Sequence, residues 1–169
     1  MSNNKNITFE SSSENFLRKC EKLIYTSCHV ASYTKEDNLA KFKQLLLENE
    51  DLINEDDFSY YKSGTCTSNL LISMVRNYAE KDFYEVAINH GLKINRKFYY
   101  YDPNKKKINI NYYILKSYIS SSRPEFPMAY GILSSLDKNF SNNIIIKKYY
   151  DKQKKEEPFI IKRFSEYFD

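Results

Sequence analysis

The chain has 169 residues and a net charge of +4, and its length fits one domain. Its hydrophobic fraction of 41%, with 16 tyrosines and 11 phenylalanines, is enough to form a core. Three glycines and four prolines are too few for the many turns of a barrel or sandwich, so the composition favours helices joined by polar connections. The three cysteines, Cys20, Cys28 and Cys66, are irregularly spaced, which argues against a disulfide framework and favours a reducing compartment.

Residues 1–14 are rich in serine and asparagine and predict a mobile N-terminal segment ahead of a single domain over 15–169. The segment has no apolar stretch of the kind found in a signal peptide. Elsewhere the longest apolar runs, such as 144–146, are far too short to cross a bilayer. We therefore expect a cytoplasmic monomer with no membrane partner, which would act in a host cytoplasm if it is a secreted effector.

In chain order, apolar residues at helical spacing predict four helical pairs. The first pair has a polar link over 32–38 between two stripes: Phe16, Leu17, Cys20, Leu23 and Ile24, then Leu39, Phe42, Leu45 and Leu46. The second pair has a polar break at 77–82 between its two sets: Leu70, Leu71, Met74 and Val75, then Phe83, Val86, Ala87 and His90. Gly91 follows, where a left-handed residue would end the helix.

The third and fourth pairs follow the same rhythm. The third breaks at 120–123 between two sets: Ile114, Leu115, Tyr118 and Ile119, then Met128, Ala129, Ile132, Leu133 and Leu136. The fourth breaks at 152–157 between two more: Ile144, Ile145 and Tyr149, then Ile160, Ile161, Phe164, Tyr167 and Phe168. Because a helical pair cannot bury its apolar face alone, the pairs must stack. The predicted fold class is mainly α, a short α-solenoid of about four helical hairpins.

The exits of the first two pairs match each other at an offset of 41 residues. Residues 45–54, LLLENEDLIN, align with 86–95, VAINHGLKIN. The pattern resembles the ankyrin repeat family, whose second helix and loop read as an apolar triplet, two variable residues, Gly-Ala, one variable residue and Val-Asn. Gly91 stands at the family's glycine in the second copy, whereas Glu50 replaces it in the first.

Other parts of the ankyrin pattern are missing. The family's Thr-Pro-Leu-His start of the first helix has only residues 67–70, TSNL, as its nearest equivalent. The offset also exceeds the usual period of about 33 residues, so the loops must be longer, and the specific resemblance covers residues 39–95. It implies an ankyrin-like scaffold that recognises other proteins through loop tips and concave inner helices, and it implies no catalysis.

Residues 97–110 predict one β-hairpin between the second and third pairs. Two β-prone runs flank Asp-Pro-Asn-Lys at 102–105, which is type I turn chemistry. On such a finger these side chains would contact a partner protein: Tyr99, Tyr100, Tyr101, Asn104, Lys105, Lys106 and Lys107. The alternative is that the tyrosines pack on neighbouring helices while the lysines keep an edge strand soluble.

No catalytic constellation stands out. Cys28 and His29 are adjacent, so on a helix they point in different directions, and nothing marks a third group that would orient a base; we expect a buried Cys28 and a half-exposed His29. His90 is expected in a last helical turn, where a positive imidazole suits the helix dipole. Zinc spacing and the glycine motifs that bind phosphates are missing. We expect no enzyme, no cofactor and no metal, with an enzyme using these three residues as an alternative.

Charge is divided unevenly along the chain. Residues 1–95 carry 11 basic and 14 acidic side chains, and residues 96–169 carry 15 and 8. The densest basic segment, 147–155, interleaves lysine and tyrosine and predicts, as an alternative function, a basic helical nucleic-acid-binding protein. The acidic clusters at 48–51 and 55–57 lack the glycine and spacing of a calcium loop and predict a solvated face or a partner patch.

These patterns together predict a non-enzymatic protein–protein interaction module. Its contacts would come from loop tips, from the exits near Asn54 and Asn95, from the hairpin and from the concave helices. A pathogen effector in a host–pathogen interaction and an immunity-type inhibitor that caps a toxin both fit this prediction.

Overall fold

The structure is a computed structural model that describes residues 12–57, 68–98, 108–109 and 125–141. In these ranges the chain is mainly helical, as predicted. The helices are α1 Ser12–Tyr25, α2 Lys35–Glu48, α4 Leu70–Arg76, α5 Lys81–Asn89, α7 Glu125–Leu136 and α8 Lys138–Ser141. The strands are β1 Lys97–Phe98 and β2 Ile108–Asn109.

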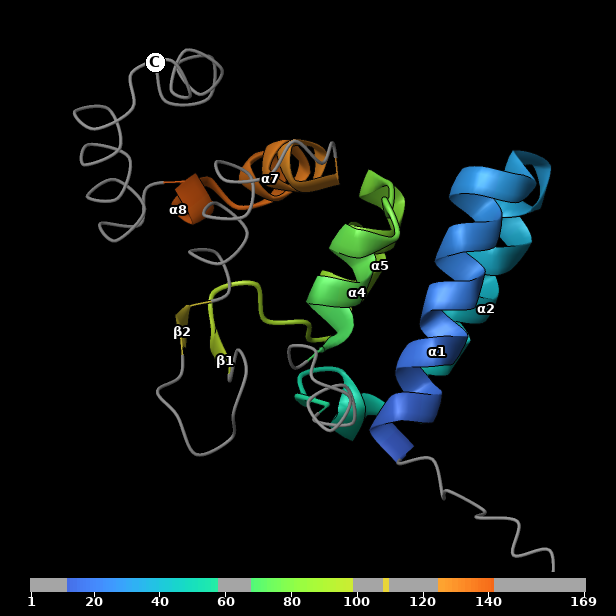
Figure 1. Cartoon of the computed structure of the whole chain (residues 1–169), viewed down its shortest axis with the longest axis horizontal. Helices are drawn as coiled ribbons and strands as arrows, with labels where there is room; N and C mark the ends of the chain where they lie inside the picture. Colours follow the sequence, from blue (N-terminus) through green and yellow to red (C-terminus); the bar gives the residue numbers. More distant parts are fainter. Residues whose placement is uncertain (1–11, 58–67, 99–107, 110–124, 142–169) are drawn as a thin grey trace, which may run out of the picture.

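Helices α1 and α2 form the first helical hairpin (Figure 1). The stripe predicted on α1 is confirmed, because Phe16, Leu17, Cys20 and Ile24 are buried and Leu23 is partly buried. On α2, Phe42 and Leu46 are buried, while Leu39 and Leu45 pack at the edge of the core. The helical spacing of apolar residues therefore predicted both faces that the hairpin buries.

The polar link predicted over 32–38 is too long. Helix α2 begins at Lys35, so Asn38 lies inside the helix, where it is buried. Its Nδ2 donates hydrogen bonds to Ser27 Oγ at 3.1 Å and to Thr34 Oγ1 at 3.0 Å. Because these partners satisfy the buried amide, the helix tolerates an asparagine that its sequence assigns to a loop.

Helix α4 is buried on all sides. Six consecutive residues, from Leu70 to Val75, are buried, whereas the sequence predicted a single stripe that left out Ile72 and Ser73. Asn69 caps the helix, its side chain accepting a hydrogen bond from Ile72 N at 3.0 Å, as short polar N-cap residues do. A helix that is apolar all round belongs inside a layered core, and α4 lies between α1 and α7.

Helix α5 ends where the sequence predicts. Gly91 has φ +96°, Gly91 N donates to Ile88 O at 3.0 Å and Leu92 N donates to Ala87 O at 2.9 Å. These two bonds define a Schellman motif, in which glycine takes the left-handed position at no steric cost. The chain then leaves the helix toward β1.

The two helical hairpins stack side by side. Helix α1 packs against α4, and α2 packs against α5, an arrangement visible in Figure 1. The rings of Phe42 on α2 and Phe83 on α5 meet edge to face, with centroids 5.3 Å apart, which is a favoured aromatic geometry. Across the other interface, Ser73 Oγ on α4 donates to Glu21 Oε1 on α1 at 2.7 Å.

Helix α7 covers the other side of the second hairpin. It packs against α4 and α5 and crosses the end of α4 rather than running parallel with it (Figure 1). Ala129, Tyr130 and Leu133 are buried on this helix, but Met128, which the sequence placed on the apolar face, is exposed. The ring of Tyr130 packs instead on Phe140 of α8, with centroids 5.6 Å apart.

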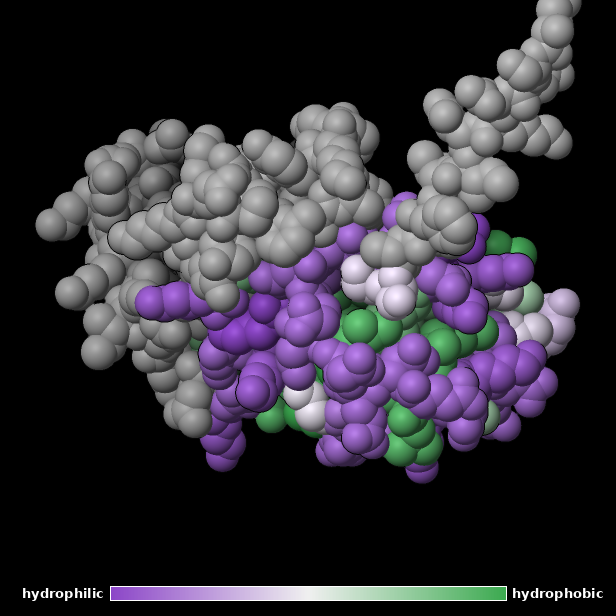
Figure 2. All heavy atoms as spheres, turned by 90° about the horizontal axis from the view of Figure 1, so that it is seen from below, coloured by the Kyte–Doolittle hydropathy of each residue, from purple (hydrophilic) through white to green (hydrophobic). Residues whose placement is uncertain are grey.

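The short strands β1 and β2 pair antiparallel, Lys97 opposite Asn109 and Phe98 opposite Ile108. A β-hairpin over 97–110 requires antiparallel pairing of this kind between its two ends. The mobile N-terminal segment predicted over 1–14 is too long, because α1 begins at Ser12. Its residues 1–11 lie outside the described residues, as do the first helix of the third pair and the fourth pair. From below, the described surface is mostly hydrophilic with small separate hydrophobic areas (Figure 2).

Candidate functional site

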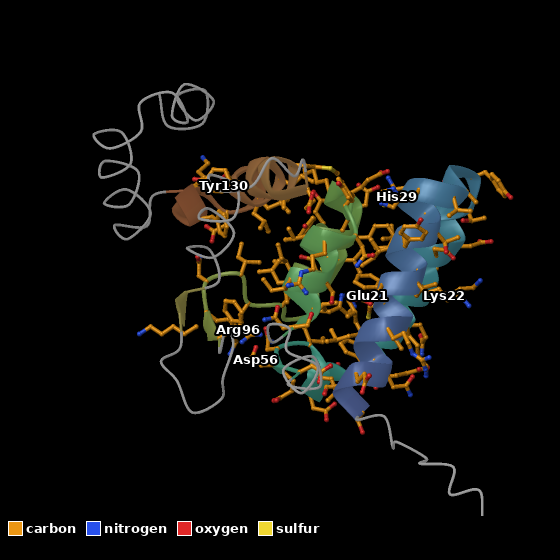
Figure 3. The ribbon with its side chains drawn as sticks, viewed as in Figure 1. Glu21, Lys22, His29, Asp56, Arg96 and Tyr130 are labelled. Atoms are coloured by element: carbon orange, nitrogen blue, oxygen red, sulfur yellow. The ribbon has the colours of Figure 1, made fainter. Side chains whose placement is uncertain are left out.

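The helix-to-helix turns of the first two hairpins carry a cluster of aromatic side chains. The ring of His29 packs on Tyr25, with centroids 4.8 Å apart, and meets the edge of Tyr78 at 5.1 Å. Its Nε2 donates to the backbone oxygen of Asn77 at 3.3 Å. His29, labelled at the end of α1 in Figure 3, therefore joins the turn of the first hairpin to the turn of the second.

Large apolar side chains are exposed around this cluster. Tyr25 is 51% exposed, Val30 69% and Tyr33 89%. They are three of the five large hydrophobic side chains that are exposed in the described part of the chain. We call Tyr25, His29, Val30, Tyr33 and Tyr78 the aromatic tip.

The backbone of the tip is irregular. Residues Thr26–Val30 form a π-helical turn, a geometry that is rare and concentrated at functional sites. Tyr78 has φ +57°, which a side chain with a Cβ adopts at a cost of about 1 kcal/mol or more. Two costly conformations thus meet around one histidine ring, and strained backbone of this kind points to a functional surface.

Polar contacts hold the tip in place. The hydroxyl of Tyr78 donates to Glu125 Oε2 at 3.1 Å, which ties the second turn to the start of α7. Lys35 forms ion pairs with Glu80 and with Asp82, whose Oδ2 is 2.7 Å from Nζ. Hydrogen bonds from Lys35, first to Asp82 and then to Glu80, raise the pKa of the lysine above its ordinary value.

The opposite edge of the stack is held by asparagines. Asn54 Nδ2 donates to Gly91 O at 2.9 Å, and Asn54 Oδ1 accepts from Lys93 N at 2.8 Å. Asn95 Nδ2 donates to Asp137 Oδ2 at 2.8 Å. The two exits that the sequence expected to meet a partner use these amides to contact the next part of their own chain.

The acidic cluster at 55–57 is solvated only in part: Glu55 is exposed, but the two aspartates are not. Asp57 is 2% exposed, and its backbone forms an antiparallel bridge with Ser68. Asp56 Oδ1 lies 2.7 Å from Nη2 of Arg96, with both side chains largely buried, and the pair is labelled in Figure 3. The prediction of a solvated face is wrong for Asp56, because Arg96, a cation distant in sequence, pairs with this carboxylate.

Within the described part of the chain, the residues considered for catalysis form no catalytic arrangement with one another. Cys28 is partly buried and His29 is exposed, where the sequence expected a buried thiol and a half-exposed ring. Burial raises the pKa of the Cys28 thiol, which favours the protonated, weakly nucleophilic form. His90, predicted in the last turn of α5, is the C-cap residue directly after it, and its Nδ1 donates to Val86 O at 2.8 Å. Across the described ranges, no three His, Cys, Asp or Glu side chains are grouped to hold a metal ion.

The predicted partner-binding residues Tyr99, Tyr100, Tyr101, Asn104, Lys105, Lys106 and Lys107 lie outside the described residues, as does the basic segment 147–155. The aromatic tip was not predicted from the sequence. Within the sequence, only the neighbouring Cys28 and His29 drew attention to this turn. The exposure of Tyr25 and Tyr33 could not be predicted, because it depends on where the neighbouring hairpin ends in space.

No family model matches the chain. No curated protein and no solved structure matches it significantly. The resemblance to the ankyrin repeat family therefore stays a prediction. Among the helices described, none is long and apolar enough to cross a membrane.

Proposed function

We propose that the chain is a non-enzymatic binding module, an ankyrin-like α-solenoid that recognises another protein. The observation that carries the proposal is the aromatic tip, an exposed apolar cluster on a strained backbone at the turns of two stacked helical hairpins. Tyrosine is among the residues that dominate binding energy at protein interfaces. Clustered exposed apolar side chains in a soluble domain mark interaction sites more often than chance.

The solenoid part of the proposal rests on the asparagines at the two exits. Asn54 and Asn95 stand at the same place in the matched decapeptides. Each asparagine forms hydrogen bonds with the segment that follows a helix of the next unit. Asn54 contacts Gly91 and Lys93, which follow α5, and Asn95 contacts Asp137, which follows α7. Asn54 bonds backbone atoms and Asn95 bonds a carboxylate, but asparagines at equivalent positions that each contact the next unit are expected of a stacked repeat, whose units contact their neighbours. The different course of α7 makes the third unit an irregular member of the array.

The test is affinity capture with matched baits. Tyr33→Ala removes the most exposed ring of the tip, and Leu47→Ala removes an exposed leucine on α2 outside the tip. We expect a captured protein, repurified and titrated directly, to bind the Tyr33→Ala chain at least about tenfold more weakly, the loss typical of a tyrosine hot spot. The Leu47→Ala chain should bind as the unaltered chain does.

Two results would overturn the proposal. One is the lack of any saturable protein partner whose affinity responds to Tyr33→Ala. The other is a gel shift with RNA or DNA that weakens steeply across a salt series, because phosphate-driven binding releases counterions. The second result would support the alternative function, a basic helical protein that binds nucleic acid.

A further inference from the structure

A groove runs along the first helical hairpin on the side that faces away from α4. It lies between α1 and α2 and has a volume of about 530 Å³. Figure 3 shows Glu21 directed toward α4 and Lys22 directed to the opposite side, and Lys22 lines the groove. The second hairpin therefore leaves this side of the first uncovered.

The groove is lined by one face of each helix. The lining residues of α1 and of the π-helical turn that follows it are Lys19, Lys22, Leu23 and Thr26, a spacing of i, i+3, i+4 and i+7 that describes a single helical stripe. On α2 the lining extends from Asn38 to Glu48, roughly 15 Å of helix at 1.5 Å per residue. The groove thus has the length of about three helical turns.

Its floor is apolar and its rims are basic. Leu23 and Leu45 are partly buried against the core and line the groove from opposite helices. Lys19, Lys22 and Lys41 also line it, and within the described ranges none of these three ammonium groups forms an ion pair. The rims therefore carry positive charge that the rest of the described chain does not neutralise.

The other polar side chains of the groove have partners. Thr26 Oγ1 donates to Lys22 O at 2.7 Å, and Asn38 bonds the hydroxyls described above. Glu48, the one carboxylate among the described lining residues, accepts a hydrogen bond from Gln44 Nε2 at 2.9 Å. The three lysines and the two leucines are therefore the lining side chains available to contact a bound partner.

We propose that this groove binds an acidic amphipathic helix of a partner protein. Its apolar residues, spaced i, i+3 or i+4 and i+7, would cover Leu23 and Leu45, and its carboxylates would meet the lysines of the two rims. None of the described residues that line the groove is aromatic, so this lining offers no stacking surface of the kind that single-stranded nucleic acid uses. A second copy of this face would place lysine against lysine. The groove adjoins the aromatic tip at Thr26 but shares no residue with it, so its occupant can be tested apart from the proposed function.

The test uses a designed helical peptide of about 14 residues, long enough for the groove. Leucines form one stripe, glutamates flank it, and a fluorophore reports binding by anisotropy. We expect saturable binding of this peptide and at least about tenfold weaker binding to the double variant K22E/K41E, since two attractive charge contacts become repulsive. A peptide with lysine in place of glutamate should show the reverse preference.

Lys93→Glu is the matched control, because Lys93 is exposed on the opposite edge of the stack and does not line the groove. It should leave the affinity of the acidic peptide unchanged. The proposal fails if the acidic peptide does not bind, if a scrambled acidic peptide binds equally well, or if K22E/K41E and K93E weaken it alike. It also fails if the groove takes a dT oligonucleotide in preference, or if sedimentation shows a dimer that K22E/K41E dissociates. None of these outcomes bears on the capture result for Tyr33→Ala.

Discussion

Tyr84, on α5, is fully buried, and its hydroxyl has no hydrogen-bond partner among the described residues. Tyr84 lies outside the apolar stripe predicted for α5, because a phenol one position from Phe83 gives no periodic signal. A buried hydroxyl without a partner loses its hydration and gains nothing in return. The ring contributes to the core while the oxygen opposes folding.

Replacing Tyr84 by phenylalanine should therefore stabilise the protein by about 1 kcal/mol in urea unfolding at pH 7. Burial, and then Cys28, raise the pKa of this phenol, so the folded state keeps the proton after the unfolded state has begun to release it near pH 10. Stability of the unaltered protein then falls with rising pH. Tyr84→Phe lacks that contribution, so its advantage should widen above about pH 10. A constant or shrinking difference would contradict the burial of the phenol.

The helices themselves were largely predictable from the spacing of apolar residues. Local signals also located the Gly91 stop, because a left-handed C-cap is a property of one residue and its neighbours. Asn38, Asp57 and Ser73 were assigned to solvent or left out, since each is buried through a polar partner that sequence periodicity does not report. The aromatic tip was missed for a related reason, because its surface is formed by turns from two separate hairpins.

Asn54 connects one helical hairpin to the exit of the next through two hydrogen bonds. Asn54→Ala leaves Gly91 O and Lys93 N without these partners, so we expect a loss of about 1–2 kcal/mol in the free energy of unfolding. Asn89→Ala is the matched control, because Asn89 is exposed on α5 and alanine favours helix. Urea titrations of both variants decide the matter, and equal stabilities would show that the asparagine does not hold the units together.

At the scale of the whole molecule, the first two hairpins are joined at both edges. Lys35 reaches Glu80 and Asp82 at the turns, and the Asp56–Arg96 pair lies near the exits (Figure 3). The hydrophobic interface between them includes the contact of Phe42 with Phe83. Joined in this way, the two hairpins are expected to unfold as one cooperative unit rather than separately.

A double-mutant cycle on Asp56 and Arg96 tests the link at the exits. The pair is largely buried, so removing either partner alone by Asp56→Ala or Arg96→Ala should cost about 3 kcal/mol, and the coupling energy should exceed about 1 kcal/mol. Lys81 and Glu85, 3.5 Å apart and about half exposed, provide the control cycle, with an expected coupling of about 0.3–0.5 kcal/mol. If the two cycles gave equal coupling energies, the Asp56–Arg96 pair would be no stronger than a solvent-exposed ion pair, and the predicted link at the exits would be wrong.

The unneutralised lysines on α1 and α2 have one more consequence. A stack of hairpins ends in an uncovered side onto which a second protomer could add. Two protomers that met there face to face would form a closed dimer, but the encounter would bring both sets of ammonium groups together, and their mutual repulsion opposes it. The same cations that suit an acidic guest thus oppose dimerisation of the chain through its own uncovered side.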